Sequence, residues 1–138
     1  MKIEIAGAEQ TAGLGSHCWA TWGLDTCSDR GGLVTAEAPL IAESPFTARL
    51  ILAAESPSEI TMHVYPAAPE HELEIDAHDK RMWEIVDRSD EAVLQADLSG
   101  QDAPAADMEL DPGLYLFSVF TEWGAKGDAT HGFLVEVH

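Results

Sequence analysis

The sequence is poor in basic residues. It has seven lysines and arginines against 25 aspartates and glutamates, which gives a formal net charge of −18 at pH 7. Binding to nucleic acid or to an anionic membrane relies on clustered lysine and arginine side chains, so we expect neither partner. The acidity itself is typical of a well-solvated surface or of a salt-adapted or high-GC source. The alternative is an inhibitor or decoy that binds a basic partner.

Long hydrophobic runs are also absent. Residues 1–7 lack the apolar stretch of a signal peptide, and no segment approaches the roughly 20 apolar residues of a transmembrane helix. We therefore expect no membrane insertion of this domain. The sequence leaves open a cytoplasmic protein or a mature domain from a longer exported precursor.

Familiar catalytic motifs are missing. The sequence contains no Gly-x-Ser-x-Gly elbow, His-Glu-x-x-His pair, phosphate-binding glycine loop or dinucleotide fingerprint. His63, His71 and His78 could converge on a metal ion, but dispersed surface histidines are the simpler interpretation. We predict that the protein is not an enzyme and has no cofactor and no metal site.

Cysteine is scarce, with only Cys18 and Cys27. The short polar segment between them lets the chain fold back far enough for a disulfide, provided that the compartment is oxidising. Two reduced thiols are the alternative, and two thiols are too few for an ordinary zinc site. His17 is a poor base for a Cys18 thiolate, because neighbours on a strand point to opposite faces.

Short segments with period-2 alternation run through the whole chain, with turn residues between them. They predict an all-β fold, an antiparallel immunoglobulin-like β-sandwich of about seven to nine strands. We expect a single domain over residues 1–138, with residues 1–15 as a loose N-terminal segment. Strands are expected over residues 2–6, 16–22, 46–54, 60–65, 82–86, 92–96, 114–123 and 129–137. Polar or irregular loops are expected over residues 7–15, 23–32, 36–45 and 99–106.

Two further expectations concern strand partners and charge. Residues 46–54 and 60–65 should form a hairpin or a near-neighbour pair, and residues 82–86 and 92–96 should flank a turn. Residues 70–77 alternate acidic and other side chains. That pattern favours a solvated strand face whose charges oppose aggregation. The alternative is a site for a cation or a basic ligand.

The clearest stretch is residues 111–137. It contains a turn, a strand with apolar residues on both faces, a glycine-containing connection and a closing strand. Apolar residues on both faces indicate a central strand. The sandwich centre should hold Tyr115, Phe117, Val119, Phe133 and Val135. The order Asp-Pro-Gly-x-Tyr also predicts a tyrosine corner, in which the hydroxyl of Tyr115 bonds to upstream backbone.

The tryptophans suggest a possible ligand. Trp19, Trp22 and Trp83 lie beside polar or charged residues, and exposed indole rings on a sandwich suit stacking on sugars. The alternative is that Trp19 or Trp22, together with Trp123, anchors the core.

The chain resembles a known family in several motifs, which span roughly residues 16–137. They are Cys18-Trp19, the strand at 60–65, Pro112-Gly113-x-Tyr115-x-Phe117-x-Val119, Trp123, and Gly132-Phe133-x-Val135-x-Val137. These motifs resemble a β-sandwich domain of uncharacterised bacterial exported proteins and lipoproteins. They are also similar to extracytoplasmic tails on membrane metallopeptidase-like sensors. The family's closing strand usually opens Tyr-x-Phe, and His131 takes the place of that Tyr.

The resemblance implies an extracytoplasmic location, either secreted or membrane-anchored in a longer precursor, and an oxidised Cys18–Cys27 pair. It implies no particular activity. Together with the absent motifs it favours a non-catalytic extracytoplasmic interaction or sensing module. A carbohydrate-binding sandwich and an acidic inhibitor or decoy remain as alternatives.

Overall fold

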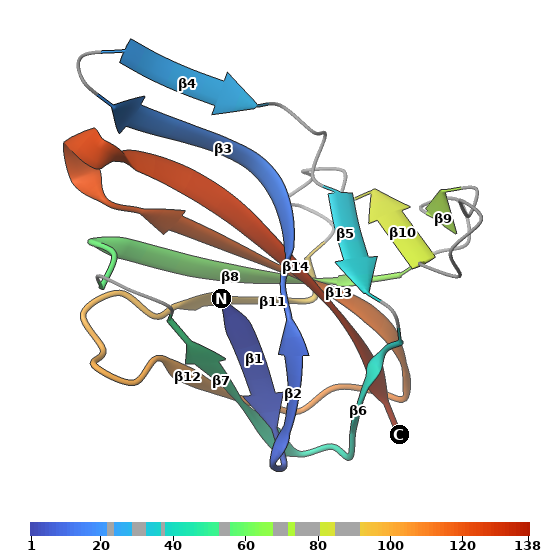
Figure 1. Ribbon diagram of the computed structural model, residues 1–138. Coiled ribbons are helices and arrows are strands. Elements are labelled where there is room, and N and C mark those ends of the chain that lie inside the picture. Colours follow the sequence, from blue (N-terminus) through green and yellow to red (C-terminus); the bar gives the residue numbers. More distant parts are fainter. Residues whose placement is uncertain are drawn as a thin grey trace.

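A long antiparallel hairpin lies at the centre of the computed structural model shown in Figure 1. Its strands are β13 (Gly113–Glu122) and β14 (Gly127–Val137), joined through the short 3-10 helix η3 (Gly124–Lys126). β13 lies between β14 and β8 (Glu59–Pro66), so it is hydrogen-bonded along both edges. The prediction of a central strand within residues 111–137 is confirmed.

The structure describes most of the chain, in eight segments. They are residues 1–21, 24–28, 33–36, 38–52, 56–67, 72–73, 81–84 and 92–138. Side chains are described for residues 1–13, 38–52, 56–67 and 92–138. Within these segments there is no α-helix, and none of the described elements is a helix of the length and apolarity needed to cross a membrane.

The strands form two main sheets and a small third one. The larger sheet has the order β11-β8-β13-β14-β3-β4, with β6 pairing parallel to β14. Its remaining strands are β11 (Leu94–Asp97), β3 (Gly13–Thr21), β4 (Leu24–Ser28) and β6 (Leu40–Ala42). The smaller sheet has the order β12-β7-β1-β2 and consists of β12 (Ala105–Met108), β7 (Phe46–Ile51), β1 (Lys2–Ile5) and β2 (Ala8–Thr11). The third has the order β5-β10-β9 and consists of β5 (Leu33–Ala36), β10 (Arg81–Glu84) and β9 (Glu72–Leu73).

The main core lies between the two larger sheets. Alternate residues of each strand point into it, as the period of a strand requires. The large sheet contributes Ile60, Met62, Val64, Tyr115, Phe117, Val119, Phe133 and Val135, and the small sheet contributes Ile3, Ile5, Ala48 and Leu50. The prediction of an all-β sandwich with Tyr115, Phe117, Val119, Phe133 and Val135 at its centre is thus confirmed. Because Ile3 and Ile5 are fully buried, the N-terminal strands belong to the sandwich.

The described segments alone contain 14 strands, more than the seven to nine that were predicted. Three of the additional strands, β2, β4 and β6, lie where loops were expected, and β12 begins in the loop expected over residues 99–106. These strands are short and lie at sheet edges. β2 and β12 carry mostly small or polar residues, and β6 has only three residues, too few to show an alternation. β2 follows a two-residue turn in which both Ala6 (φ 51°) and Gly7 (φ 83°) have positive φ, the geometry of a type I′ hairpin.

The predicted pairing of residues 46–54 with 60–65 is wrong. β7 belongs to the small sheet and β8 to the large one, so the chain crosses between sheets after β7. β10 and β11, the strands expected on either side of a turn, lie in different sheets: β10 pairs with β5 and β9, and β11 pairs with β8. The expected turn lies outside the described residues. Two strands that face one core from opposite sheets share the same alternation, so alternation assigns the buried face but not the partner.

The predicted tyrosine corner is present. The hydroxyl of Tyr115 donates a hydrogen bond to the backbone carbonyl of Asp111 at 2.7 Å. Burial of the ring, and then the negative charge of Asp111, raise the pKa of the Tyr115 hydroxyl. This bond fixes the entry of the chain into β13.

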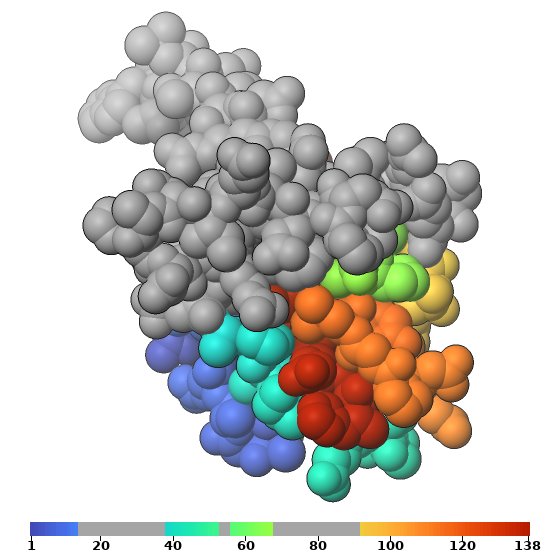
Figure 2. Space-filling model, turned by 90° about the vertical axis from the view of Figure 1, so that its right-hand side faces the viewer, coloured from blue at the N-terminus to red at the C-terminus, as the bar shows by residue number. Residues whose placement is uncertain are grey.

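The outer edge of β14 is completed by a side chain. β3 pairs with β14 up to Gly132, and β6 pairs with it from Val135 onward. Between them Leu134 is bonded by Gln10: its N–H donates to Gln10 Oε1 at 2.9 Å, and its carbonyl accepts from Gln10 Nε2 at 3.0 Å. Gln10 Nε2 also donates to the carbonyl of Ala38 at 2.9 Å. In Figure 2 the N-terminal segment (blue), the region of β6 (cyan) and the end of β14 (red) lie side by side.

Replacement of Gln10 should be costly for a surface strand. Gln10→Leu leaves the N–H and carbonyl of fully buried Leu134 without partners, at about 1–3 kcal/mol for each buried group. We expect the free energy of unfolding in urea to fall by at least about 2 kcal/mol. Gln10→Glu should also destabilise, because a carboxylate cannot donate to the two carbonyls. The neighbouring exposed change Thr11→Val should stay within about 0.5 kcal/mol of wild type. Equal effects of the three changes would contradict the bridging role.

Candidate functional site

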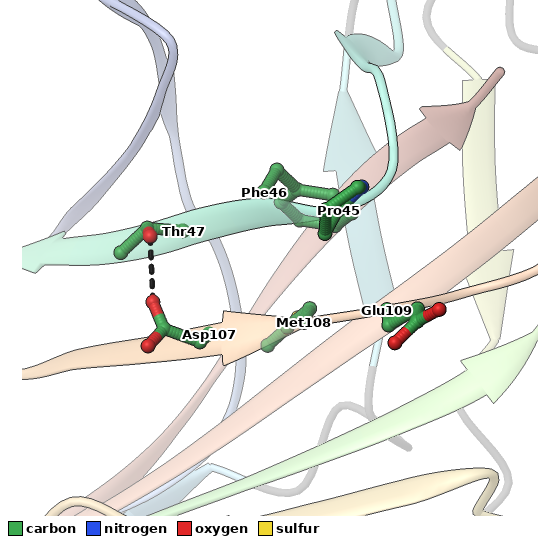
Figure 3. A pocket seen from close by; sticks show the side chains of 6 residues that line it. All are labelled: Pro45, Phe46, Thr47, Asp107, Met108 and Glu109. Atoms are coloured by element: carbon green, nitrogen blue, oxygen red, sulfur yellow. Dashed lines mark hydrogen bonds between the residues drawn. The ribbon is translucent and has the colours of Figure 1, made fainter.

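A shallow hollow of about 410 Å³ lies on the small sheet, beside β7 and the edge strand β12. Residues Pro45, Phe46, Thr47, Asp107, Met108 and Glu109 line it (Figure 3). Thr47 is directly opposite Asp107 in the register, and Phe46 is opposite Met108. Since Met108 is buried, its neighbours Asp107 and Glu109 stand at the exposed side of the strand end.

The polar side chains of the hollow are partly held in place. The hydroxyl of Thr47 donates a hydrogen bond to Asp107 Oδ1 at 2.6 Å, drawn as a dashed line in Figure 3. One carboxylate oxygen of Asp107 is therefore oriented along the sheet surface, while the carboxylate keeps further capacity as an acceptor. The arrangement gives an oriented anion on the exposed face of the sheet, whereas Phe46, at the preceding position of β7, is packed against the core.

The backbone around the hollow is tied to neighbouring segments. The N–H of Leu110 donates to Ser44 Oγ at 3.0 Å, and the N–H of Ser44 donates to the carbonyl of His138 at 3.4 Å. The Ser44–Pro45 peptide bond is cis. These contacts join the two walls of the hollow to the end of β14, so the site rests on the core of the sandwich.

The hollow carries more negative than positive charge. Residues 89–125 contain no lysine or arginine. The basic residue on the neighbouring strand, Arg49, lies opposite Ala105 on the same exposed face as Thr47, and its guanidinium is 3.8 Å from Glu4 on β1. Among the described residues no ion pair involves Asp107 or Glu109. The site can therefore accept positive charge from a ligand.

A second acidic feature crosses the large sheet. Glu59, Glu122 and Asp128 lie directly opposite one another on β8, β13 and β14, and we call them the carboxylate row. The pKa of Glu122 is raised, first by its hydrogen bond with Glu59, then by desolvation and by the negative charges of Glu59 and Asp128. In the described part of the chain no group of histidine, cysteine and acidic side chains has the geometry of a metal site.

His131 is the described histidine with the most unusual surroundings. It lies opposite Val119 on β13, next to a bulge in the pairing of β14 with β3. Its Nδ1 is buried, and no described group bonds to it. Burial, and then the positive charge of the N-terminal amino group, lower the pKa of His131 from 6.5 to about 4. The folded state therefore holds the neutral imidazole.

The protein should lose stability in mild acid because of His131. A histidine with a lowered pKa in the folded state contributes its full stability above the unfolded pKa near 6.5, and this is lost as pH falls toward about 4. Each pH unit in that interval changes stability by at most about 1.4 kcal/mol, so the loss is up to about 3 kcal/mol. His131→Phe should flatten the pH dependence of the free energy of unfolding over this interval. An unchanged slope in the variant would contradict the assignment.

The tryptophan and acidic-strand predictions fall largely outside the described residues. Trp22 lies outside them, and of Trp19 and Trp83 only the backbone is placed, on β3 and β10. Of the alternating acidic segment at 70–77, only Glu72–Leu73 is described, as β9. Stacking of sugars on Trp19, Trp22 and Trp83 stays a prediction.

The two cysteines lie on paired strands. β4 occupies part of residues 23–32, where a loop was expected, and Cys27 on β4 is directly opposite Cys18 on β3. Opposite residues of an antiparallel pair have Cα atoms about 4.5–5.5 Å apart, within the range that disulfides span. The backbone register is thus compatible with the predicted bond, and the side chains lie outside the described part.

Thiol titration tests the cysteine pair directly. Denatured, unreduced protein made under oxidising conditions should show no free thiol, and reduction should release two. Cys27→Ser should lower the free energy of unfolding by about 2–4 kcal/mol without changing the far-ultraviolet circular dichroism spectrum. Two free thiols before reduction would disprove the disulfide.

Comparison of the chain with protein-family models, with curated proteins and with solved structures finds no match. The sequence predictions did not single out the residues of the hollow. Phe46 and Thr47 were expected on a strand, and residues 107–109 were assigned to no element. Two signals in the sequence point to the hollow. They are the absence of basic residues over 89–125 and the alternation of acidic residues through Asp107 and Glu109.

Proposed function

We propose that this chain is a non-catalytic interaction module that binds a positively charged segment of a partner at the hollow beside β12. The observation that carries the proposal is the pairing of an oriented carboxylate, Asp107, with a second acid, Glu109, on an exposed surface where no ion pair among the described residues involves either of them. Complementary charge steers a partner to such a surface and fixes its orientation there. The exposed ring of Pro45, which also lines the hollow, adds apolar contact area for the hydrocarbon parts of lysine or arginine side chains.

The setting that we propose for this module is an immunoglobulin-like domain outside the cytoplasm. The tyrosine corner at Tyr115 and the parallel pairing of β6 with the end of β14 support the immunoglobulin-like assignment. The family resemblance supports the location, and so does a register that suits a Cys18–Cys27 bond, since such bonds persist in oxidising compartments.

A second candidate function is an acidic inhibitor or decoy that presents the carboxylate row to a basic partner. The raised pKa of Glu122 favours it, because a cation on the row would relieve the crowding of negative charge. The two candidates use different surfaces. The first uses the hollow on the small sheet, with two acids, and the second uses the three adjacent carboxylates on the large sheet.

Binding of a cationic probe distinguishes these surfaces. Isotope-labelled protein is titrated with an oligolysine of about 20 residues at about 150 mM salt, with oligoglutamate as the negative control. We expect saturable binding of oligolysine with chemical-shift changes centred on Thr47, Asp107 and Glu109. The double change Asp107→Asn/Glu109→Gln should weaken binding at least about fivefold, about 1 kcal/mol.

The matched control removes the same charge elsewhere. Glu59→Gln/Glu122→Gln takes two carboxylates from the row and should change the affinity less than about twofold. The reverse order of effects would assign binding to the row and support the inhibitor or decoy. Absence of saturable oligolysine binding would refute the proposed function.

A further inference from the structure

We propose that the outer edge of β12 binds an extended, lysine- or arginine-rich segment of a partner protein by β-strand addition. The inference rests on the proposed function and states how the cationic segment is held. In strand addition, backbone hydrogen bonds give affinity and alternate side chains give specificity. β12 has the geometry and the charge for both contributions.

The backbone of β12 presents free groups along its outer edge. β12 is the last strand of the small sheet, and among the described strands only β7 pairs with it. The N–H of Leu50 donates to the carbonyl of Pro104 at 2.8 Å, so Pro104 is a residue of β12's side whose backbone bonds to β7. Residues that bond to the partner strand alternate with residues that do not in an antiparallel pair. Ala106 and Met108 therefore bond to β7, and the backbone groups of Ala105 and Asp107 point outward.

One outward group already has a partner from outside the sheet. The N–H of Ala105 donates to Gln101 Oε1 at 3.3 Å, in agreement with that phase. The N–H and carbonyl of Asp107, together with the carbonyl of Ala105, face away from β7. These three groups have the spacing that an added strand uses.

The side chains on this edge select for positive charge. Asp107 and Glu109 are two residues apart and both exposed, so they lie on one face of the strand end. A residue directly opposite Asp107 on an added strand would have its Cβ about 4.5–5.5 Å away, close enough for an ion pair. Lysine or arginine at alternate positions of the added segment would therefore meet both acids.

The same charges oppose pairing with a second copy of this chain. Two β12 edges paired antiparallel about Asp107 would place this carboxylate directly opposite its own copy, and like charges directly opposite each other are destabilising. With a net charge of −18 the whole chain repels its own copies. A basic partner strand is therefore favoured over self-association.

The opposite edge of the same sheet supplies a matched control. β2 is also a terminal strand, but its acidic residue Glu9 lies 3.4 Å from Lys2 and is neutralised within the chain. The N–H of Ala12 donates to the carbonyl of Met1 at 3.0 Å, so by the same alternation the N–H of Glu9 points outward. Glu9→Pro and Asp107→Pro thus remove equivalent outward N–H groups.

The test uses two peptides of about ten residues that alternate lysine with valine, and in one of them the backbone nitrogens of the lysines are methylated. Both carry the same charge, but the methylated peptide lacks the N–H groups that lysines opposite Asp107 would direct at β12. We expect the unmethylated peptide to bind at least tenfold more tightly and to slow hydrogen exchange of the Asp107 amide. Asp107→Pro should weaken that binding at least tenfold, Asp107→Asn about threefold, and Glu9→Pro less than twofold.

Other outcomes overturn the inference. Equal binding of the two peptides without protection of the Asp107 amide would refute strand addition and leave the proposed function standing. Failure of both peptides and of oligolysine to bind would refute both. Protection of Asp107 that grows with protein concentration alone, with dimers in sedimentation, would assign the edge to a second copy. Hydrogen exchange of the Asp107 amide in wild-type protein tests strand addition even if Asp107→Pro does not fold.

Discussion

A buried strand of eleven residues needs hydrogen-bond partners along both edges, and β14 meets this need with four different segments. β13 covers one edge throughout. β3, the side-chain amide of Gln10 and β6 share the other. These pieces cannot shift independently, because a displacement of one leaves buried backbone groups of β14 unpaired. The N-terminal strands, β6 and the end of the chain are thereby joined into one unit around the central hairpin.

This constraint also decides which edges of the small sheet remain open. β2 continues into β3 through Ala12 and so passes from the small sheet to the large one, which places β1 and β2 on one side of β7. β12 is left at the other side. The hollow forms there because the segment after β6 is tied at Ser44 to both Leu110 and His138. The open edge and the hollow beside it are thus consequences of how β14 is paired.

The placement of the acids matters more than their number. At the hollow, a hydroxyl donor from Thr47 orients Asp107 and leaves the carboxylate able to accept positive charge. In the carboxylate row, Glu122 faces two other acids, and the crowding raises its pKa. At the other edge of the small sheet, Lys2 neutralises Glu9. Three groups of similar composition therefore differ in chemistry because of their neighbours across the strands.

Much of the sandwich could be predicted from local patterns. The alternation in Phe117 and Val119, in Phe133 and Val135, and in Met62 and Val64 assigned the buried faces, because a strand has a period of two residues wherever it lies. The tyrosine corner could also be predicted, because the hydroxyl of Tyr115 bonds to Asp111, only four residues earlier in the chain. The edge strands β2 and β12 have few apolar residues and β6 has only three residues, so none of them shows an alternation that could have predicted it.

The sequence by itself therefore determined the fold class, the core faces and the acidity of the chain. Only the tertiary structure decided that β7 and β8 belong to opposite sheets, that Gln10 completes the edge of β14, and that Asp107 meets Thr47 on the strand at the edge of the small sheet. The physical reason is that burial acts on each residue locally, whereas hydrogen-bond partners across a sheet are chosen among segments far apart in the chain. The candidate site consists of such long-range pairings, so it appears only when the strands are in place.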